Sequence, residues 1–233
     1  KGLDINLTSN WDGTVDSFIW SKDGEKVYFI AAIDGTKQLF EVNFPGLTKI
    51  MVRVQQITKG DFDVNGIIGF DDSKIIATRG DMNHASEIFS YDLKSSEWNQ
   101  ITKVNDEVYS KITQCKTERR YVTTTDGKKM LVWVILPPNF DASKKYPTLL
   151  YCQGGPQSAL TQFYSFRWNF QVMASQGYVV VAPNRRGMPG HGVEWNEKIS
   201  GDWGGQVMDD YLSAIDDVSK ESYVDKERLG AIG

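Results

Sequence analysis

Residues 146–157 read YPTLLYCQGGPQ, in which a short apolar run is followed at once by two glycines and a proline. The run from Thr148 to Cys152 predicts a buried strand, and the Gly-Gly-Pro after it predicts a turn. A second apolar run from Tyr178 to Ala182 predicts another buried strand, and residues 163–176 between the two have the aromatic, amphipathic pattern of a helix. Strand, helix and strand in this order predict a parallel crossover, the unit from which α/β sheets are built.

The sequence on either side of this crossover extends the predicted sheet. Upstream, residues 119–125 and 130–136 are β-rich runs joined by an Asp-Gly-Lys-Lys turn, which predicts an antiparallel hairpin. Downstream, we expect a third buried strand from Arg228 to Ile232, preceded by a helix with acidic residues in its first turns. The apolar face expected of that helix consists of Val207, Met208, Tyr211, Leu212, Ile215 and Val218. A hairpin followed by parallel crossovers predicts the opening of an α/β-hydrolase sheet.

The first 107 residues or so consist of short β-rich runs separated by turn residues, and they contain a repeat. One copy spans residues 18–58 and the second spans residues 67–102, with corresponding positions 44 to 50 residues apart. This period suits a propeller blade of about 40 to 50 residues. We therefore expect a mixed fold, with about two C-terminal blades of a β-propeller in residues 1–110 and the N-terminal part of an α/β-hydrolase domain in residues 111–233. An antiparallel sandwich is the alternative for the first region.

Composition limits the classes of partner. The chain has 233 residues, of which 40% are hydrophobic, and a formal net charge of −4. Because its Lys and Arg residues are spread along the chain, nucleic acid is not an expected partner. No apolar run approaches the roughly 18 to 20 residues that span a bilayer. Cys115 and Cys152 have no metal-ligand spacing; we expect small buried side chains, and the sequence leaves a disulfide between them open.

The chain contains no complete catalytic or cofactor motif. Gly-x-Ser-x-Gly, the phosphate-binding Gly-x-x-x-x-Gly-Lys, His-Glu-x-x-His, Cys-x-x-Cys and Gly-x-Gly-x-x-Gly after a strand are all missing from the sequence. The two histidines are poor candidates for a general base, since His84 is expected in an exposed loop and His191 in the long loop of residues 183–205. We therefore expect no catalytic residue, no metal and no cofactor in this chain.

Two incomplete features remain. Gly154 and Gly155 follow a buried strand and precede a helix, where a hydrolase needs a backbone N–H that faces a developing oxyanion. Residues 184–192, Asn-Arg-Arg-Gly-Met-Pro-Gly-His-Gly, follow the second buried strand at the sheet edge where ligands of α/β proteins bind. Each feature alone is as typical of an ordinary turn or a flexible basic loop.

Together, the stretches 146–157, 180–187 and 223–233 resemble the prolyl oligopeptidase family of serine peptidases, in particular its bacterial dipeptidyl peptidases. The resemblance implies a β-propeller followed by an α/β-hydrolase domain. It also implies that Gly233 is the first glycine of a nucleophile elbow, with the serine two residues later and the Asp and His later still. We therefore expect the intact protein to release short peptides from N-termini through an acyl-enzyme without a cofactor, and residues 1–233 alone to be inactive.

The resemblance also assigns roles to individual residues. It implies that Gly155 is the backbone donor of the oxyanion hole and that Gly154 provides clearance. Gln153 departs from the Tyr or His that often stands there, and its amide could act as a donor only if it points inward. Asn184, Arg185, Arg186 and Gly187 form the expected active-site loop. Its arginines could orient the loop or meet a carboxylate, but we expect at least one to be solvated at the surface.

The resemblance also bears on the cellular location of the intact protein and leaves other activities open. The family resemblance implies export, for instance to the periplasm, and allows a homodimer of the intact protein acting on peptide substrates. An acylaminoacyl peptidase or esterase would share the loop and the elbow. A non-catalytic scaffold that binds peptides would have the elbow serine replaced.

Overall fold

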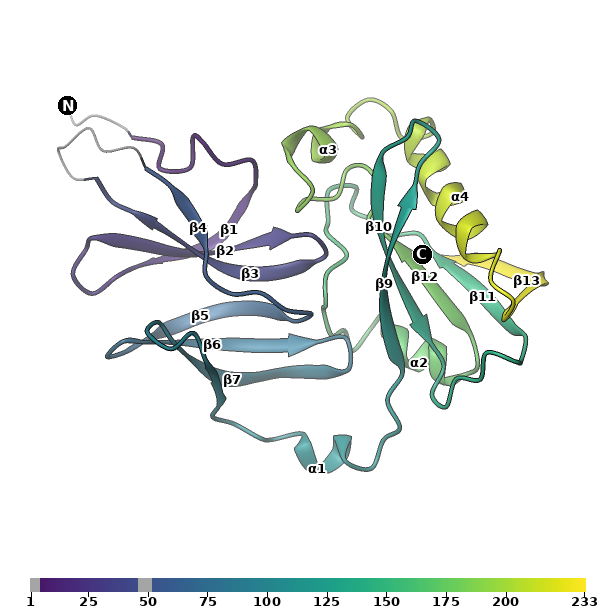
Figure 1. Ribbon diagram of the computed structural model, residues 1–233, viewed down its shortest axis with the longest axis horizontal. Helices are drawn as coiled ribbons and strands as arrows, with labels where there is room; N and C mark the ends of the chain where they lie inside the picture. The colour runs from purple at the N-terminus through teal and green to yellow at the C-terminus, as the bar shows by residue number, and fades with distance from the viewer. Residues whose placement is uncertain (1–4, 46–51) are drawn as a thin grey trace.

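The computed structural model describes residues 5–45 and 52–233, which form two β-sheets side by side (Figure 1). The first sheet has eight strands and the second has five. The first comprises β1 (Val15–Trp20), β2 (Lys26–Ile33), β3 (Thr36–Asn43), β4 (Val54–Gln56), β5 (Asp63–Asp71), β6 (Lys74–Asp81), β7 (His84–Asp92) and β8 (Trp98–Gln100). The second comprises β9 (Lys116–Thr123), β10 (Lys129–Leu136), β11 (Tyr146–Tyr151), β12 (Val179–Pro183) and β13 (Val224–Ile232). The helices are α1 (Asp106–Tyr109), α2 (Phe170–Ser175), α3 (Val193–Glu197) and α4 (Gln206–Val218).

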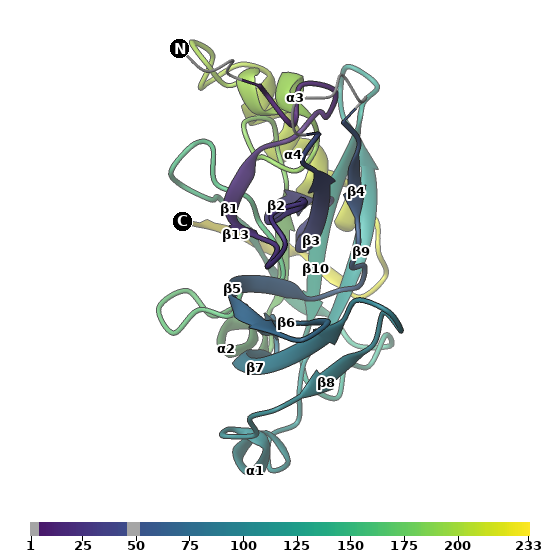
Figure 2. The same ribbon diagram turned by 90° about the vertical axis from the view of Figure 1, so that its left-hand side faces the viewer.

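The first sheet consists of two four-stranded antiparallel units that correspond to the two copies of the sequence repeat. Strands β1 to β4 pair in order, as do β5 to β8, and a single parallel pair, Lys37 with Asp63, joins the units. Figure 2 shows the units one above the other. A shared apolar cluster, which includes Tyr28 and Leu39 from one unit and Ile75 and Tyr91 from the other, holds them together. Apolar burial is therefore continuous across the repeat boundary.

The second sheet has the strand order β13-β11-β12-β10-β9. As predicted, β9 and β10 form an antiparallel hairpin, whereas β11 runs parallel to both β12 and β13. Alternate side chains point to opposite faces of a strand, so Val132 and Val134 pack with α4 while Leu131 and Trp133 pack with α2. The sheet therefore has a helix on each face.

The helix expected from residue 163 to residue 176 is correct only in its second half, because α2 begins at Phe170. The Ser165 hydroxyl accepts hydrogen bonds from the backbone N–H groups of Arg167 and Trp168, which stabilises a local turn instead of a helix. Asn169 then caps α2 by accepting from two backbone N–H groups. Phe163 and Trp168, which precede the cap, pack against the core from a loop, whereas Phe166 is 90% exposed.

Two other expectations are wrong in detail. Met208 and Leu212 of α4 are 50% and 49% exposed, although they were expected on its apolar face. Asp210, which the sequence placed only in the first turns of the helix, is fully buried. Strand β13 forms as predicted but is largely exposed rather than buried. It lies at the edge of the sheet and pairs with β11 alone among the described strands.

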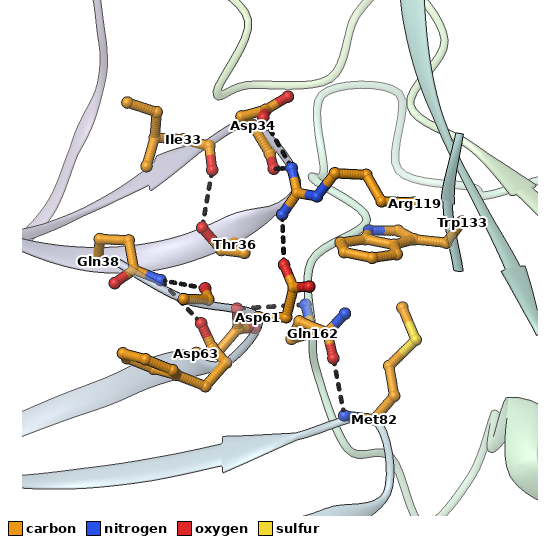
Figure 3. Close-up of polar contacts among 12 residues, drawn as sticks. Ile33, Asp34, Thr36, Gln38, Asp61, Asp63, Met82, Arg119, Trp133 and Gln162 are labelled. Atoms are coloured by element: carbon orange, nitrogen blue, oxygen red, sulfur yellow. Dashed lines mark hydrogen bonds and ion pairs between the residues drawn. The ribbon is translucent and has the colours of Figure 1, made fainter. Parts of the chain in front are cut away.

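A polar network joins the two sheets (Figure 3). Arg119 of β9 donates to the carboxylates of Asp34 and Asp61 at 2.7 and 2.6 Å, and its guanidinium lies 4.8 Å from the centre of the Trp133 ring. Nearby, the buried Asp63 carboxylate accepts from the backbone N–H of Lys37 at 2.8 Å and from the Gln162 N–H at 3.2 Å. Side chains of the first sheet thus fix the loop that follows β11.

Candidate active site

An open cavity of about 690 Å³ lies beyond the carboxyl ends of β11 and β13. Its lining residues are Tyr151, Gln153, Gly154, Gly155, Ser158, Arg167, Trp168 and Gly233. The cavity therefore brings together the glycine pair and the glycine expected to begin the nucleophile elbow, which are far apart in sequence. The edge of a sheet at the carboxyl ends of parallel strands is where ligands of α/β proteins commonly bind.

Parallel pairing of β11 with β13 sets the position of Gly233. The backbone N–H of Cys152 donates to the Ile232 carbonyl at 2.7 Å, which brings the two chain segments together just before each reaches the cavity. A Cβ atom on Gly233 would lie 2.3 Å from the Cys152 carbonyl oxygen, closer than real Cβ atoms approach. The close contact explains why a glycine stands at position 233.

The Gly154-Gly155 pair presents its backbone to the cavity. Gly155 has φ = +64°, a conformation that favours glycine, and no heavy atom lies within 4 Å of the place where a Gly154 Cβ would stand. Within residues 5–45 and 52–233, neither glycine N–H donates to a protein acceptor. These donors are available to a ligand oxygen. The Gln153 amide also reaches this side, since it donates to the Ser158 hydroxyl at 3.4 Å.

The predicted arginine loop is buried, which corrects the expectation of a solvated arginine. Asn184, Arg185 and Arg186 are 0%, 3% and 4% exposed. The Asn184 side chain binds the backbone N–H and carbonyl of Leu160 at 3.1 and 2.9 Å. Gly187 has φ = +97°, and a Cβ there would lie 2.7 Å from the Pro156 carbonyl oxygen. The loop therefore packs beneath the glycine turn instead of lining the cavity.

The two arginines have different partners. Arg185 donates to the carbonyls of Gln153 and Pro156, at 3.0 and 2.7 Å, and so contacts the glycine turn directly. Arg186 pairs with the buried Asp210 at 3.4 Å and with Asp126 at 2.7 Å. Burial raises the pKa of Asp210, while hydrogen bonds from Thr124 and Arg186 lower the pKa of Asp126. Arg186 thus ties α4 to the β9–β10 turn, away from the cavity.

Comparison with known proteins shows similarity to one family of peptidases. A model described as the prolyl oligopeptidase family matches residues 164–233. Dipeptidyl-peptidase 5 of Porphyromonas gingivalis is 42% identical over 232 residues, which cover 100% of this chain and 33% of that protein. Dipeptidyl-peptidase 5 of Porphyromonas endodontalis is 46% identical over 209 residues, which cover 89% of this chain and 29% of that protein. Residues 164–233 thus match the prolyl oligopeptidase family, and the chain as a whole is similar to these two dipeptidyl peptidases.

The chain spans about a third of the length of these relatives. Solved structures of the family share its fold. An acylaminoacyl peptidase of Pyrococcus horikoshii superposes with a TM-score of 0.81 at 23% identity, over 96% of this chain and 34% of that one. Dipeptidyl peptidase 4 of Porphyromonas gingivalis superposes with a TM-score of 0.72 at 21% identity, over 94% of this chain and 31% of that one. At these identities the likeness concerns the fold alone.

Several residues of the cavity were not expected from the sequence. Tyr151, Ser158, Arg167 and Trp168 line it, and the Tyr211 hydroxyl supports it from α4. The position of Tyr151 at the carboxyl end of a predicted strand was a usable signal, because that end of the sheet holds the site. Arg167 and Trp168 gave none, since they lie in a segment with a helical sequence pattern.

The two histidines lie outside this cavity. His84 begins β7 rather than a free loop, and it is half-buried between the Asp81 carboxylate, 2.8 Å from its Nδ1, and the Tyr109 ring. His191 lines a different cavity beside Asp12 and Trp195, and burial lowers its pKa. Neither histidine lines the cavity of the glycine pair.

The described residues hold no group of three or more His, Cys, Asp or Glu side chains that could bind a metal ion. Cys115 and Cys152 are both unpaired thiols, and burial raises the pKa of each, that of Cys115 to about 11. Within residues 5–45 and 52–233, no helix is long and apolar enough to cross a bilayer.

Proposed function

We propose that this chain forms part of a serine exopeptidase that removes dipeptides from the N-termini of peptides, and that it supplies the oxyanion loop and the start of the nucleophile elbow. The observation that carries the proposal is the cavity shared by Gly155 and Gly233. The identity of 42% and 46% to proteins named dipeptidyl-peptidase 5 supports the substrate class. Peptides are then the partners of the site.

The proposed reaction follows from this geometry. A serine two residues after Gly233 would lose its proton to a histidine and form a bond to the scissile carbonyl carbon. The N–H of Gly155 would donate to the oxygen that becomes negatively charged. The histidine would then protonate the departing amine. In deacylation, water would lose a proton to the histidine and attack the acyl carbon, and the serine oxygen would leave with that proton. Gln153 would take part only if its amide turned from Ser158 to that oxygen.

The domain assignment is part of the same proposal. The two four-stranded units within residues 1–110 would be two blades of a propeller, and residues 111–233 would be the first part of an α/β-hydrolase domain. The antiparallel pairing inside each unit, and the single strand pair between the units, support the blade assignment. Helix α1, at the foot of the connection between the sheets in Figure 1, lies at the proposed boundary.

The test uses the intact protein and three reporters, namely a dipeptidyl amide with a free amine, an acyl-aminoacyl amide and a simple ester. We expect hydrolysis of the dipeptidyl amide, loss of that activity when the elbow serine is replaced by alanine, and no activity from residues 1–233 alone. Cleavage of only the acylated reporter, or of only the ester, would replace the dipeptidyl assignment. Binding of peptides without any hydrolysis would favour a scaffold.

Location and assembly are proposed on the family resemblance alone. We propose that the intact protein is exported, to the periplasm in a bacterium with two membranes, and that it forms a homodimer. Fractionation of cells that express the intact protein, and light scattering of the purified protein, test the two statements separately. Recovery in the cytoplasm, or the mass of a single chain, would overturn the respective statement.

A further inference from the structure

Arg185 holds the glycine turn from the protein side at two points. Its Nη2 donates to the Gln153 carbonyl at 3.0 Å and its Nη1 donates to the Pro156 carbonyl at 2.7 Å. These carbonyls stand directly before and directly after the Gly154-Gly155 pair. The most flexible residues of the loop are therefore bracketed by two fixed points.

Fixing these carbonyls also directs the N–H groups between them. A peptide unit is planar and trans, so the Gln153 carbonyl and the Gly154 N–H belong to one plane and point in opposite directions. With the carbonyl turned toward Arg185, the N–H is turned away from it. The Pro156 contact limits rotation at the other end, and the Gly155 N–H lies between the two anchors.

Further contacts hold Arg185 itself, among them a hydrogen bond from its Nη1 to the Arg186 carbonyl at 2.7 Å. Its Nε donates to the Tyr211 hydroxyl at 3.0 Å, and that hydroxyl donates to the Gln153 carbonyl at 3.2 Å. Burial raises the pKa of Tyr211, so the hydroxyl keeps the proton that it donates. The Arg185 backbone carbonyl accepts from the Trp195 indole N–H at 3.1 Å. A Cβ on Gly187 would lie 2.7 Å from Arg185 Nη1, so only glycine leaves room for the guanidinium.

We propose that Arg185 is a positioning residue for the oxyanion hole, and that Tyr211 is its second support. The planar guanidinium spans the two carbonyls and so aligns the glycine N–H groups before a substrate arrives. A lysine ammonium is a single compact donor group and cannot span both carbonyls in the same way. The inference rests on the proposed function, because alignment matters only if an oxyanion forms in the cavity.

The test compares variants of the intact protein on the dipeptidyl reporter. Arg185→Lys should lower kcat by about 10- to 100-fold with little change in KM, which is less than the roughly 100- to 1,000-fold loss when an oxyanion donor is removed outright. Tyr211→Phe should lower kcat by a smaller factor, since it removes both hydrogen bonds of the Tyr211 hydroxyl but leaves the two bonds from the Arg185 guanidinium to the glycine turn. Arg120→Lys is the matched control. It alters a half-buried arginine that binds Asp217 of α4 and Glu221 just after that helix, and that does not touch the glycine turn.

A second readout separates positioning from general damage. A peptide aldehyde forms a tetrahedral adduct whose oxygen occupies the oxyanion hole, whereas a product dipeptide does not. If Arg185 aligns the N–H groups, Arg185→Lys should lower the affinity for the aldehyde by the same factor as it lowers kcat/KM. The affinity for the product dipeptide should not change. A loss of packing alone would weaken both ligands.

The outcomes are distinguishable from failure of the proposed function. If the unaltered protein hydrolyses no reporter, the proposed function fails whatever the variants do. If the unaltered protein is active and both Arg185→Lys and Tyr211→Phe retain its kcat/KM, the positioning role is overturned. Should Arg185→Lys fail to fold, as judged by its thermal unfolding, Tyr211→Phe alone decides, and an unchanged kcat in that variant contradicts the proposal.

Discussion

Arg185 and Arg119 hold two parts of the molecule in different ways. Arg185 is 3% exposed, lies inside the α/β region, and donates to backbone carbonyls and the Tyr211 hydroxyl. The Arg119 side chain is 25% exposed, joins the two sheets, and pairs with carboxylates that are themselves substantially exposed. Neutral buried acceptors respond weakly to salt, whereas exposed ion pairs are screened. The comparison indicates that the hydrogen bonds of Arg185 at the site are insensitive to salt. The ion pairs of Arg119 between the two sheets should weaken as the salt concentration rises.

The largest effect should come from the buried ion pair next to Arg185. Asp210→Ala removes the carboxylate that pairs with the Arg186 guanidinium and accepts from its backbone N–H. Leaving that cation with only the half-exposed Asp126 should lower the free energy of unfolding by about 3 to 5 kcal/mol. Denaturant titration of the intact protein measures the loss. Asp209→Ala is the control, because its exposed side chain should matter by less than about 0.5 kcal/mol. Equal effects of the two variants would contradict a buried role for Asp210.

A second effect is the pH dependence of stability that Asp63, buried between the two sheets, should produce. Burial raises the pKa of Asp63 to about 6 from an ordinary 3.8, although the Thr161 hydroxyl and two backbone N–H groups favour the charged form. The folded state therefore binds the proton more tightly than the unfolded state. This group's contribution to stability is most favourable below about pH 4 and worsens by about 3 kcal/mol as the pH rises to about 6 and beyond.

Asp63→Asn removes this titration and keeps an oxygen that can accept from the Lys37 N–H. The free energy of unfolding of the variant minus that of the unaltered protein should increase from pH 4 to pH 6 and then level off. Chemical denaturation at several pH values measures this difference. A difference that stays constant over this range would show that Asp63 does not titrate as its burial implies.

A smaller effect should appear at the exposed side of the junction. Arg119→Gln loses hydrogen bonds to Asp34 and Asp61, with an expected cost of about 1 kcal/mol because the pair is partly solvated. The cost should shrink in 1 M salt, where the Debye length is about 3 Å. Denaturation at low and high salt checks this, with Arg185→Gln expected to show no such salt dependence. The comparison fails if both arginine variants respond to salt alike.

The smallest effect is expected for a largely exposed ion pair. Lys111 and Glu107 form an exposed pair at 2.7 Å in the segment around α1. Lys111→Ala should change the free energy of unfolding by less than about 0.5 kcal/mol. A larger loss by denaturant titration would mean that the segment between the sheets contributes more to stability than its exposure suggests.

Local sequence patterns predicted most of the secondary structure. The β9–β10 hairpin, the parallel strands β11 to β13 and the repeat in the first sheet follow from alternation, apolar runs and turn residues. The same reasoning failed at residues 163–169, where the Ser165 hydroxyl competes with the helix for backbone N–H groups. It gave no sign that Asp210 is buried, because its buried partner, Arg186, comes from a distant loop.

By itself, the sequence determined the resemblance to the prolyl oligopeptidase family, the order of the elements and the presence of glycine at positions 154, 155 and 233. These properties depend on residue type and short spacing, so a linear pattern carries them. Only the tertiary structure decided that Arg185 is buried beneath the glycine turn, and that Gly233 meets the Cys152 carbonyl at the same cavity. The reason is physical, since a guanidinium can donate its hydrogen bonds either to water or to carbonyl groups. Its surroundings are set by chain segments that meet only when the sheet is complete.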